Sequence, residues 1–129
     1  MTPELTVLAL AALLQAAQFV AYSIAGNRQV GTKTTMGPRD TPVTLTGVAG
    51  RLQRALNNHF EALILFTIAV LVTTLSEQST WWTATCAWIY LIARVAYVPA
   101  YVSGIPGLRS AIWLAGFSAT FLILLSALI

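Results

Sequence analysis

The segment Arg51–Glu61, RLQRALNNHFE, continues without a turn residue into the apolar segment 62–75. The apolar part alone has about 14 residues, whereas a helix needs about 20 to cross a bilayer. A helix that spans here therefore carries Asn58 and Glu61 into the membrane. One narrow stripe of that helix holds its polar groups at i, i+3, i+7 and i+10: Arg51, Arg54, Asn58 and Glu61. Because a charged stripe facing lipid is very costly, we expect this stripe to face protein, water or a polar ligand.

The composition indicates a membrane protein with several spans and one small domain. Of the 129 residues, 57% are hydrophobic and only 9% are charged, whereas soluble domains average about 25% charged residues. The net charge of +3 is modest, and no basic cluster resembles a nucleic-acid surface, so we expect no nucleic-acid partner. Cys86 is the only cysteine, which excludes a disulfide within the chain.

Hydrophobic periodicity predicts an all-α bundle of four transmembrane helices. We expect spans at about 4–25, 48–75, 81–103 and 108–128, with one long loop at 26–47. Gly26 and Asn27 are typical of a helix C-terminus and predict the end of the first span. The start of the chain lacks the basic region of a signal peptide, so the first apolar segment is expected to remain as a membrane span.

Four spans place both termini on one side of the membrane. The long loop and the turn at 104–107 then share the other side, and every Lys and Arg lies in or toward it, whereas Glu4 and Glu77 mark the first side. By the positive-inside rule we predict a cytoplasmic loop and non-cytoplasmic termini.

The third predicted span carries a second polar face, formed by Arg94, Tyr97 and Tyr101 at i, i+3 and i+7. Glu61 and Arg94 have similar predicted depths along their helices, and either charge alone would be expensive in the membrane. We therefore predict an ion pair between these two side chains. Whether such a pair belongs to a ligand site or only fixes helix packing is left open by the residue types.

Four of the five remaining arginines are predicted to surround the cytoplasmic mouth of the bundle: Arg51, Arg54, Arg109 and Arg28. Arginine binds carboxylates bidentately, so this group suits a small anion that carries carboxylates. Arg109 and Ser110 also open the fourth span, where free N–H groups and the helix dipole favour an anion such as a thiolate. The alternatives are that these arginines contact phospholipid headgroups and that the loop is merely solvated.

Other kinds of site find no support in the sequence. His59 is the only histidine, and it has no Cys, His or carboxylate partner at a metal-ligand spacing, so we predict no metal site. A serine hydrolase triad and a glycine-rich phosphate loop are also missing.

These residues resemble a known family. The pattern RxxRAxxNxxE over Arg51–Glu61, followed by RVAYxxAY over Arg94–Tyr101 and by LRS at 108–110, resembles MAPEG proteins, the membrane-associated proteins in eicosanoid and glutathione metabolism. The resemblance covers nearly the whole chain. It implies a homotrimer with glutathione bound between neighbouring subunits near the cytoplasmic face.

The resemblance also implies roles for individual residues. Arg109, with Ser110 beside it, would stabilise the glutathione thiolate. The expected glutathione-binding residues are Arg51, Arg54, Asn58, Glu61, Arg94, Tyr97 and Tyr101, with Arg28 and Asp40 as looser matches in the loop. Two positions depart from relatives: Tyr97 stands where a histidine occurs, and Trp113 stands where a tyrosine can occur and supplies no phenolic hydroxyl.

The expected function is that of a glutathione-dependent membrane transferase or peroxidase. It would act on lipophilic electrophiles or lipid hydroperoxides that enter from the bilayer, with glutathione as co-substrate. The alternative is a non-catalytic protein of the same fold that binds a lipid or another anion.

Overall fold

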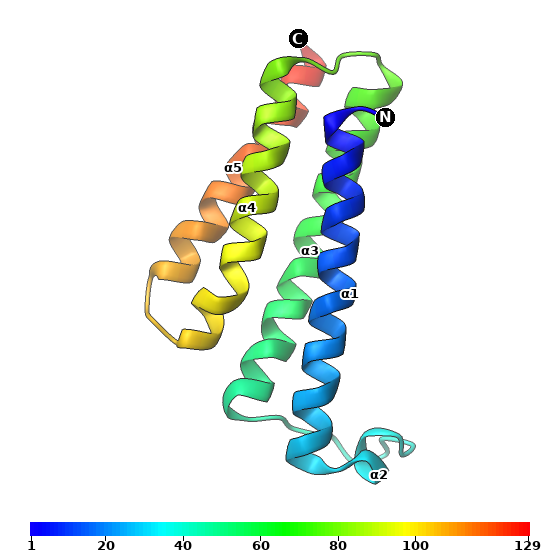
Figure 1. Cartoon of the computed structure of the whole chain (residues 1–129), viewed down its shortest axis with the longest axis vertical. Coiled ribbons are helices and arrows are strands. Elements are labelled where there is room, and N and C mark those ends of the chain that lie inside the picture. Colours follow the sequence, from blue (N-terminus) through cyan, green and yellow to red (C-terminus); the bar gives the residue numbers. More distant parts are fainter.

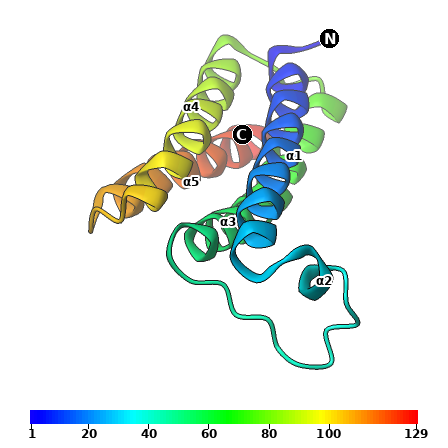
Figure 2. The same cartoon turned by 60° about the horizontal axis from the view of Figure 1, so that its bottom comes forward.

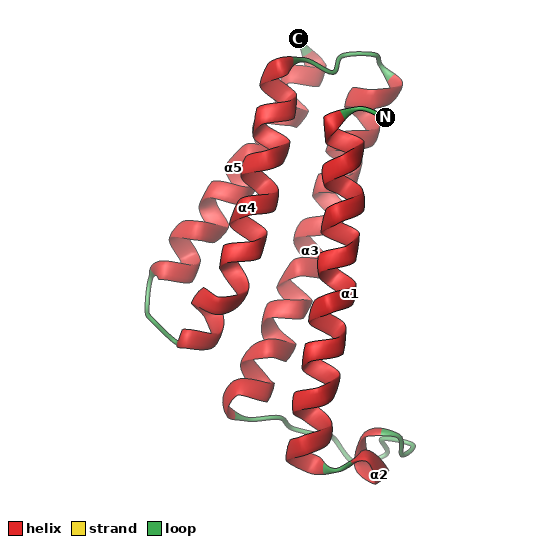
Figure 3. Cartoon of the chain, viewed as in Figure 1, coloured by secondary structure: helices red, strands yellow, loops and turns green.

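The computed structural model describes all residues, 1–129, and contains helices and no strands (Figure 3). The helices are α1 (Pro3–Val30), α2 (Thr32–Thr35), α3 (Gly47–Leu75), α4 (Trp81–Ser103) and α5 (Leu108–Leu128). Four of them, all except α2, are long and apolar enough to cross a membrane. This confirms the predicted all-α architecture with four spans.

The first helix extends further than the sequence predicted. Gly26 and Asn27 do not end it, because Gly26 is helical and buried, and a Cβ there would lie 3.4 Å from the side chain of Leu45. The helix ends instead at Gly31, whose φ of 87° is strained for any residue with a side chain. The predicted loop 26–47 is therefore shortened to 31–46, and it contains the single turn of α2.

Capping residues fix two of the helix starts. The Thr2 side chain accepts a hydrogen bond from the backbone N–H of Leu5 at 3.3 Å, with Pro3 in the first turn. Thr80 and Thr83 form a reciprocal capping box at the start of α4. These hydrogen bonds between residues close in sequence end the turn at 76–80 and begin α4.

The long helices form two antiparallel pairs, α1 with α3 and α4 with α5 (Figure 1). Both termini and the turn at 76–80 lie at one end of the bundle, and the loop 31–46 and the turn at 104–107 lie at the other (Figures 1 and 2). The two ends match the predicted grouping of loops and termini. The assignment of the loop end to the cytoplasm stays a prediction from the positive-inside rule.

A buried acid joins α1 to α4 at the end that holds the termini. Glu4 is fully buried, and its carboxylate oxygens accept hydrogen bonds from Ser79 Oγ at 2.9 and 2.8 Å and from Thr83 Oγ1. The sequence had placed Glu4 only on the side of the membrane that holds the termini. Below it lies the apolar core, in which the rings of Phe66 and Tyr90 stack with centroids 3.8 Å apart.

Candidate functional site

Two arginines from α3 and one from α5 converge on the last turn of α4. Arg51 donates from Nη1 to the carbonyl of Val102 at 3.1 Å, and Arg54 donates from Nε to Tyr101 Oη at 3.1 Å. From α5, the Arg109 guanidinium lies 4.6 Å from the centre of the Tyr101 ring. The sequence predicted that these three arginines meet, and the fold brings them together at the end of α4, with Arg54 and Arg109 on Tyr101.

Arg51 is anchored to the end of α4 by one hydrogen bond and by packing. A Cβ added to Gly104 would lie 3.2 Å from the Arg51 guanidinium, so the cation packs directly on this glycine. Its hydrogen bond to Val102 also places a positive charge at the negative end of the α4 dipole. Arg51 therefore stabilises the junction of α3 and α4.

Arg94 is the buried centre of the site, but its partners differ from those that the sequence predicted. It donates from Nη1 to Asn58 Oδ1 at 2.8 Å and from Nε to His59 Nδ1 at 3.3 Å. The predicted ion pair with Glu61 is wrong. Glu61 is one helical turn further along α3 and exposed, so Arg94 meets the amide and imidazole that precede it.

His59 fixes the position of Arg94. Its other ring nitrogen, Nε2, lies 3.0 Å from the carbonyl oxygen of Ala11 in α1. Because a guanidinium can only donate, Nδ1 accepts from Arg94 and the proton lies on Nε2, which donates to Ala11. Sequence reasoning left His59 off the polar stripe. A lone histidine next to Asn58 in an apolar helix was the one signal that could have suggested this role.

The polar side chains line an open pocket of about 190 Å³ at the loop end of the bundle. Its lining comes from three helices and consists of Asn58, Tyr97, Arg109, Ser110 and Trp113. The Arg94 guanidinium lies 4.5 Å from the centre of the Tyr97 ring, which is part of this lining. Arg109 and Ser110 are exposed.

The start of α5 adds backbone donors to this cavity. Gly107, the residue before the helix, has a φ of 81° and provides no side-chain cap, so the first N–H groups of α5 remain available. Together with Arg109, they create a positive region next to the Ser110 hydroxyl. This arrangement favours a small anion.

Two predicted site residues lie elsewhere in the chain. Arg28, near the end of α1, and Asp40, in the loop after α2, are exposed on the α2 side of the molecule. The start of α5 lies on the other side of the α1–α3 pair (Figure 2). Within one chain, the fold therefore does not bring Arg28 or Asp40 to the cavity beside Arg109.

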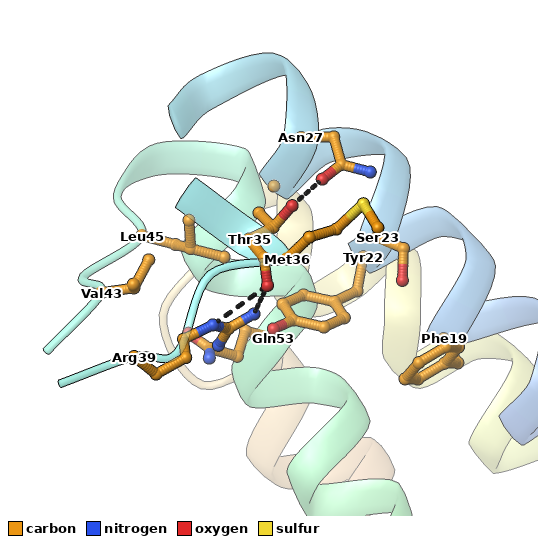
Figure 4. A pocket seen from close by; sticks show the side chains of 11 residues that line it. Phe19, Tyr22, Ser23, Asn27, Thr35, Met36, Arg39, Val43, Leu45 and Gln53 are labelled. Carbon is orange, nitrogen blue, oxygen red and sulfur yellow. Dashed lines mark hydrogen bonds between the residues drawn. The ribbon is translucent and has the colours of Figure 1, made fainter. Parts of the chain in front are cut away.

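A separate cavity of about 320 Å³ lies between α1, α2 and the start of α3 (Figure 4). Arg39, which borders it, donates from Nε and Nη2 to the carbonyl of Thr35 at 3.2 and 2.9 Å. The Thr35 hydroxyl in turn bonds to Asn27. Arg39 is thus used to fold the loop. No group of three or more His, Cys, Asp or Glu side chains that could hold a metal occurs anywhere in the chain.

Comparison with known proteins gives one result that agrees with this geometry. The family model of the MAPEG family matches residues 5–129, which is essentially the whole chain. No curated protein matches the sequence significantly. The family includes glutathione transferases and related membrane proteins. With its four membrane-spanning helices and a full-length family match, this chain belongs to the MAPEG family.

Proposed function

We propose that this protein is an integral membrane glutathione transferase or peroxidase that acts on lipophilic electrophiles or lipid hydroperoxides. The observation that carries the proposal is the convergence of Arg54, Arg109 and Tyr101 beside a polar cavity lined by Asn58 and Ser110. Several fixed cations at one end of a membrane protein suit a tripeptide that carries two carboxylates. The family to which the chain belongs uses glutathione.

In this proposal some residues of the cavity stabilise the thiolate and others bind the rest of glutathione. Arg109 and the free N–H groups of α5 stabilise the thiolate of glutathione, with the Ser110 hydroxyl as a further donor. Arg54, Asn58, Tyr97 and Tyr101 bind the rest of the tripeptide. Arg51 and Arg94 have indirect roles in glutathione binding. Arg51 holds the end of α4 in place, and Arg94 orients the amide of Asn58.

A homotrimer is the proposed working form, because MAPEG proteins are often trimers and Glu61 needs cover within the membrane. It lies about 20 Å along α3 from Gly47, and it is exposed in a helix that crosses the membrane. A carboxylate facing lipid at that depth is costly, so a neighbouring subunit or ligand is expected to cover it. Arg28 and Asp40, which do not reach the cavity of their own chain, would approach the site of a neighbouring subunit in such an assembly.

Glutathione binding tests this function directly. Calorimetry on the purified protein in detergent should show saturable binding that weakens about tenfold or more in Arg54→Ala and in Arg109→Ala, because each removes a charge-assisted contact. Lys33→Ala, which removes an exposed cation in α2, is the matched control and should bind like the parent protein.

The alternative function makes the opposite prediction. A non-catalytic relative that binds a lipid or another anion would show no glutathione binding at millimolar concentration while its assembly stays intact. Size-exclusion chromatography with light scattering, run on the same samples, identifies the trimer. An intact trimer that does not bind glutathione would contradict the proposed function. A monomer that binds glutathione would contradict only the proposed homotrimeric state.

A further inference from the structure

The cavity of about 320 Å³ at the loop end of α1 has no part in the proposed function (Figure 4). Its volume lies within the range of about 300–1,000 Å³ that is usual for pockets that bind small molecules. Its walls come from α1, from α2 with the loop that follows it, and from Gln53 in α3. It shares no lining residue with the pocket beside Arg109, so the two are separate spaces.

Hydrogen bonds tie the loop 31–46 to α1 and fix the walls of this cavity. The Gln29 side chain donates to the Thr46 carbonyl at 2.9 Å and accepts from the Thr46 N–H at 2.8 Å. The Thr35 hydroxyl bonds to Asn27 in α1, and Arg39 donates twice to the Thr35 carbonyl. The cavity is therefore formed by contacts within the chain and exists before a ligand binds.

Arg39 has a strained backbone conformation. Its φ is 61°, and Glu77 is the only other residue with a side chain that has a positive φ. At Glu77 the hydrogen bonds that end α3 account for this conformation, since its N–H bonds to the Thr74 carbonyl at 3.2 Å. No backbone hydrogen bond of this kind accounts for Arg39. Strain of this type persists where the surrounding structure holds a residue in a required place.

Several donors in the cavity are not used within the chain. The Arg39 guanidinium bonds to Thr35 through Nε and Nη2, which leaves Nη1 free. Asn27 bonds to Thr35 through its carbonyl oxygen, which leaves its amide nitrogen free. Tyr22 and Ser23 form no hydrogen bond with the other residues drawn in Figure 4. Because Arg39 is also the one charged side chain of the lining, these donors suit an anion with several oxygens, such as a phosphate.

The cavity lies at the level where α1 leaves the membrane. A span of about 20 residues that begins at Leu5 ends near Ile24. Phe19 then lies in the hydrocarbon region, whereas Asn27 lies at the level of the lipid headgroups, with Arg39 in the same lining. The cavity thus changes from apolar to polar in the same direction as a phospholipid. It has no carboxylate that could neutralise the ammonium group of a zwitterionic headgroup.

We propose that this cavity binds one phospholipid that carries a net negative charge. The phosphate oxygens accept hydrogen bonds from Arg39 Nη1 and from the amide of Asn27, and the first part of an acyl chain contacts Phe19. The hydroxyls of Tyr22 and Ser23 donate to the ester groups between these two levels. Because the lipid contacts both α1 and the loop 31–46, it holds them together. This role goes beyond the proposed transferase function and does not depend on it.

Native mass spectrometry of the full chain in detergent tests the lipid. We expect dioleoylphosphatidylglycerol to bind saturably at one equivalent per chain, about tenfold more tightly than dioleoylphosphatidylcholine. Inorganic phosphate at millimolar concentration should not displace it. Displacement by phosphate would identify a free anion as the ligand and overturn the lipid. Equal binding of the two lipids would overturn the preference for a negative headgroup.

A matched pair of variants tests the position of the lipid. Arg39→Gln and Lys33→Gln each remove one exposed positive charge next to α1, but only Arg39 lines the cavity. Arg39→Gln should weaken phosphatidylglycerol binding about tenfold through the loss of a charge-assisted contact, whereas Lys33→Gln should stay within about twofold of the parent protein. Equal losses in both variants would indicate general attraction to a basic loop and overturn the site.

Arg39 also folds the loop, so a second variant removes a donor that has no such role. Tyr22→Phe keeps the ring and loses only the hydroxyl, and it should weaken phosphatidylglycerol binding about fivefold, the effect of one hydrogen bond. Its thermal unfolding without lipid should match that of the parent protein. Unchanged lipid binding in Tyr22→Phe would show that Arg39→Gln acts through the loop alone and would overturn the site.

Glutathione binding, measured on the same variants, separates this inference from the proposed function. Arg39→Gln and Tyr22→Phe should weaken lipid binding and leave glutathione affinity unchanged. A protein that binds the lipid in this cavity but no glutathione would support the lipid site and contradict the transferase. A protein that binds glutathione, but holds phosphatidylglycerol no better in the parent than in Arg39→Gln, would support the transferase and overturn the lipid site.

Discussion

At the scale of single residues, the site separates arginines that support the structure from arginines that remain available. Arg94 is buried and held by Asn58 and His59, and Arg51 is bound to the end of α4. Arg109 is exposed at the start of α5, and its guanidinium lies over the ring of Tyr101. Among these three, Arg109 is the one placed to meet a ligand, which makes it the residue to change first.

If the protein is the proposed transferase, Arg109→Ala should raise the pH that conjugation requires. A cation beside the thiol of glutathione lowers its pKa, so removal of the cation returns the thiol pKa toward its higher free value. We expect kcat/KM to fall tenfold or more near pH 7 and the loss to shrink as pH rises toward 9. The measurement is a pH profile of conjugation, with Arg109→Lys as the variant that keeps the charge. A loss that is equal at every pH would contradict a role in thiol ionisation.

His59→Ala should destabilise the protein through the groups it leaves behind. Arg94 Nε and the Ala11 carbonyl would both lose their buried partner, at a cost of about 1–3 kcal/mol for each unsatisfied group. His59→Gln offers both a donor and an acceptor and should recover part of that loss. Thermal unfolding in detergent gives the comparison. If the alanine and glutamine variants were equally stable, the hydrogen bonds of His59 would not matter.

At the scale of elements, the turn between α4 and α5 decides where the arginines lie. Gly104 and Gly107 both have positive φ, 72° and 81°, which a residue with a side chain adopts only at a cost. The Arg51 guanidinium packs against Gly104, whereas a Cβ on Gly107 would meet nothing within 4 Å. The turn at 104–107 therefore ends α4 next to the Arg51 guanidinium and begins α5 just before Arg109.

Two glycine substitutions separate backbone strain from contact with Arg51. Gly107→Ala should lose about 1 kcal/mol of stability through strain alone. Gly104→Ala should lose more than Gly107→Ala, because its methyl group also displaces the guanidinium. Thermal unfolding of the two variants, and of each combined with Arg51→Ala, provides the measurement. The excess loss should vanish in the Arg51→Ala background, and its persistence there would contradict the packing role of Arg51.

At the scale of the whole molecule, the two ends of the bundle differ in charge. The loop 31–46 and the turn at 104–107 lie at the end where the arginines gather, and both termini lie at the opposite end, near the buried Glu4 (Figure 1). From the positive-inside rule we predict that the basic end faces the cytoplasm. A glutathione site at the basic end would then draw on the cytoplasmic pool.

Cysteine labelling tests that orientation. In a Cys86→Ala background, we expect an impermeant maleimide to label Ile129→Cys from outside intact cells, and to label Thr41→Cys only after the membrane is opened. Both positions are exposed, so access differs only by side of the membrane. The reverse pattern would invert the topology and place the cavity of Arg109 outside the cytoplasm.

The sequence by itself determined the number of spans, the grouping of loops and termini, and the set of polar residues near the loop end. Apolar length and charge placement are local properties, so they can be read from one chain. The motif around Arg51–Glu61 also indicated the family, which the match over residues 5–129 confirms.

Only the tertiary structure decided which polar groups meet. Arg94 bonds to Asn58 and His59 instead of Glu61, and Glu4 is buried against Ser79 and Thr83. Such partners depend on the axial offset and rotation of packed helices, and one turn, about 5.4 Å, is enough to exchange one partner for the next. That offset is set by side-chain packing across the whole bundle, which no single helix specifies.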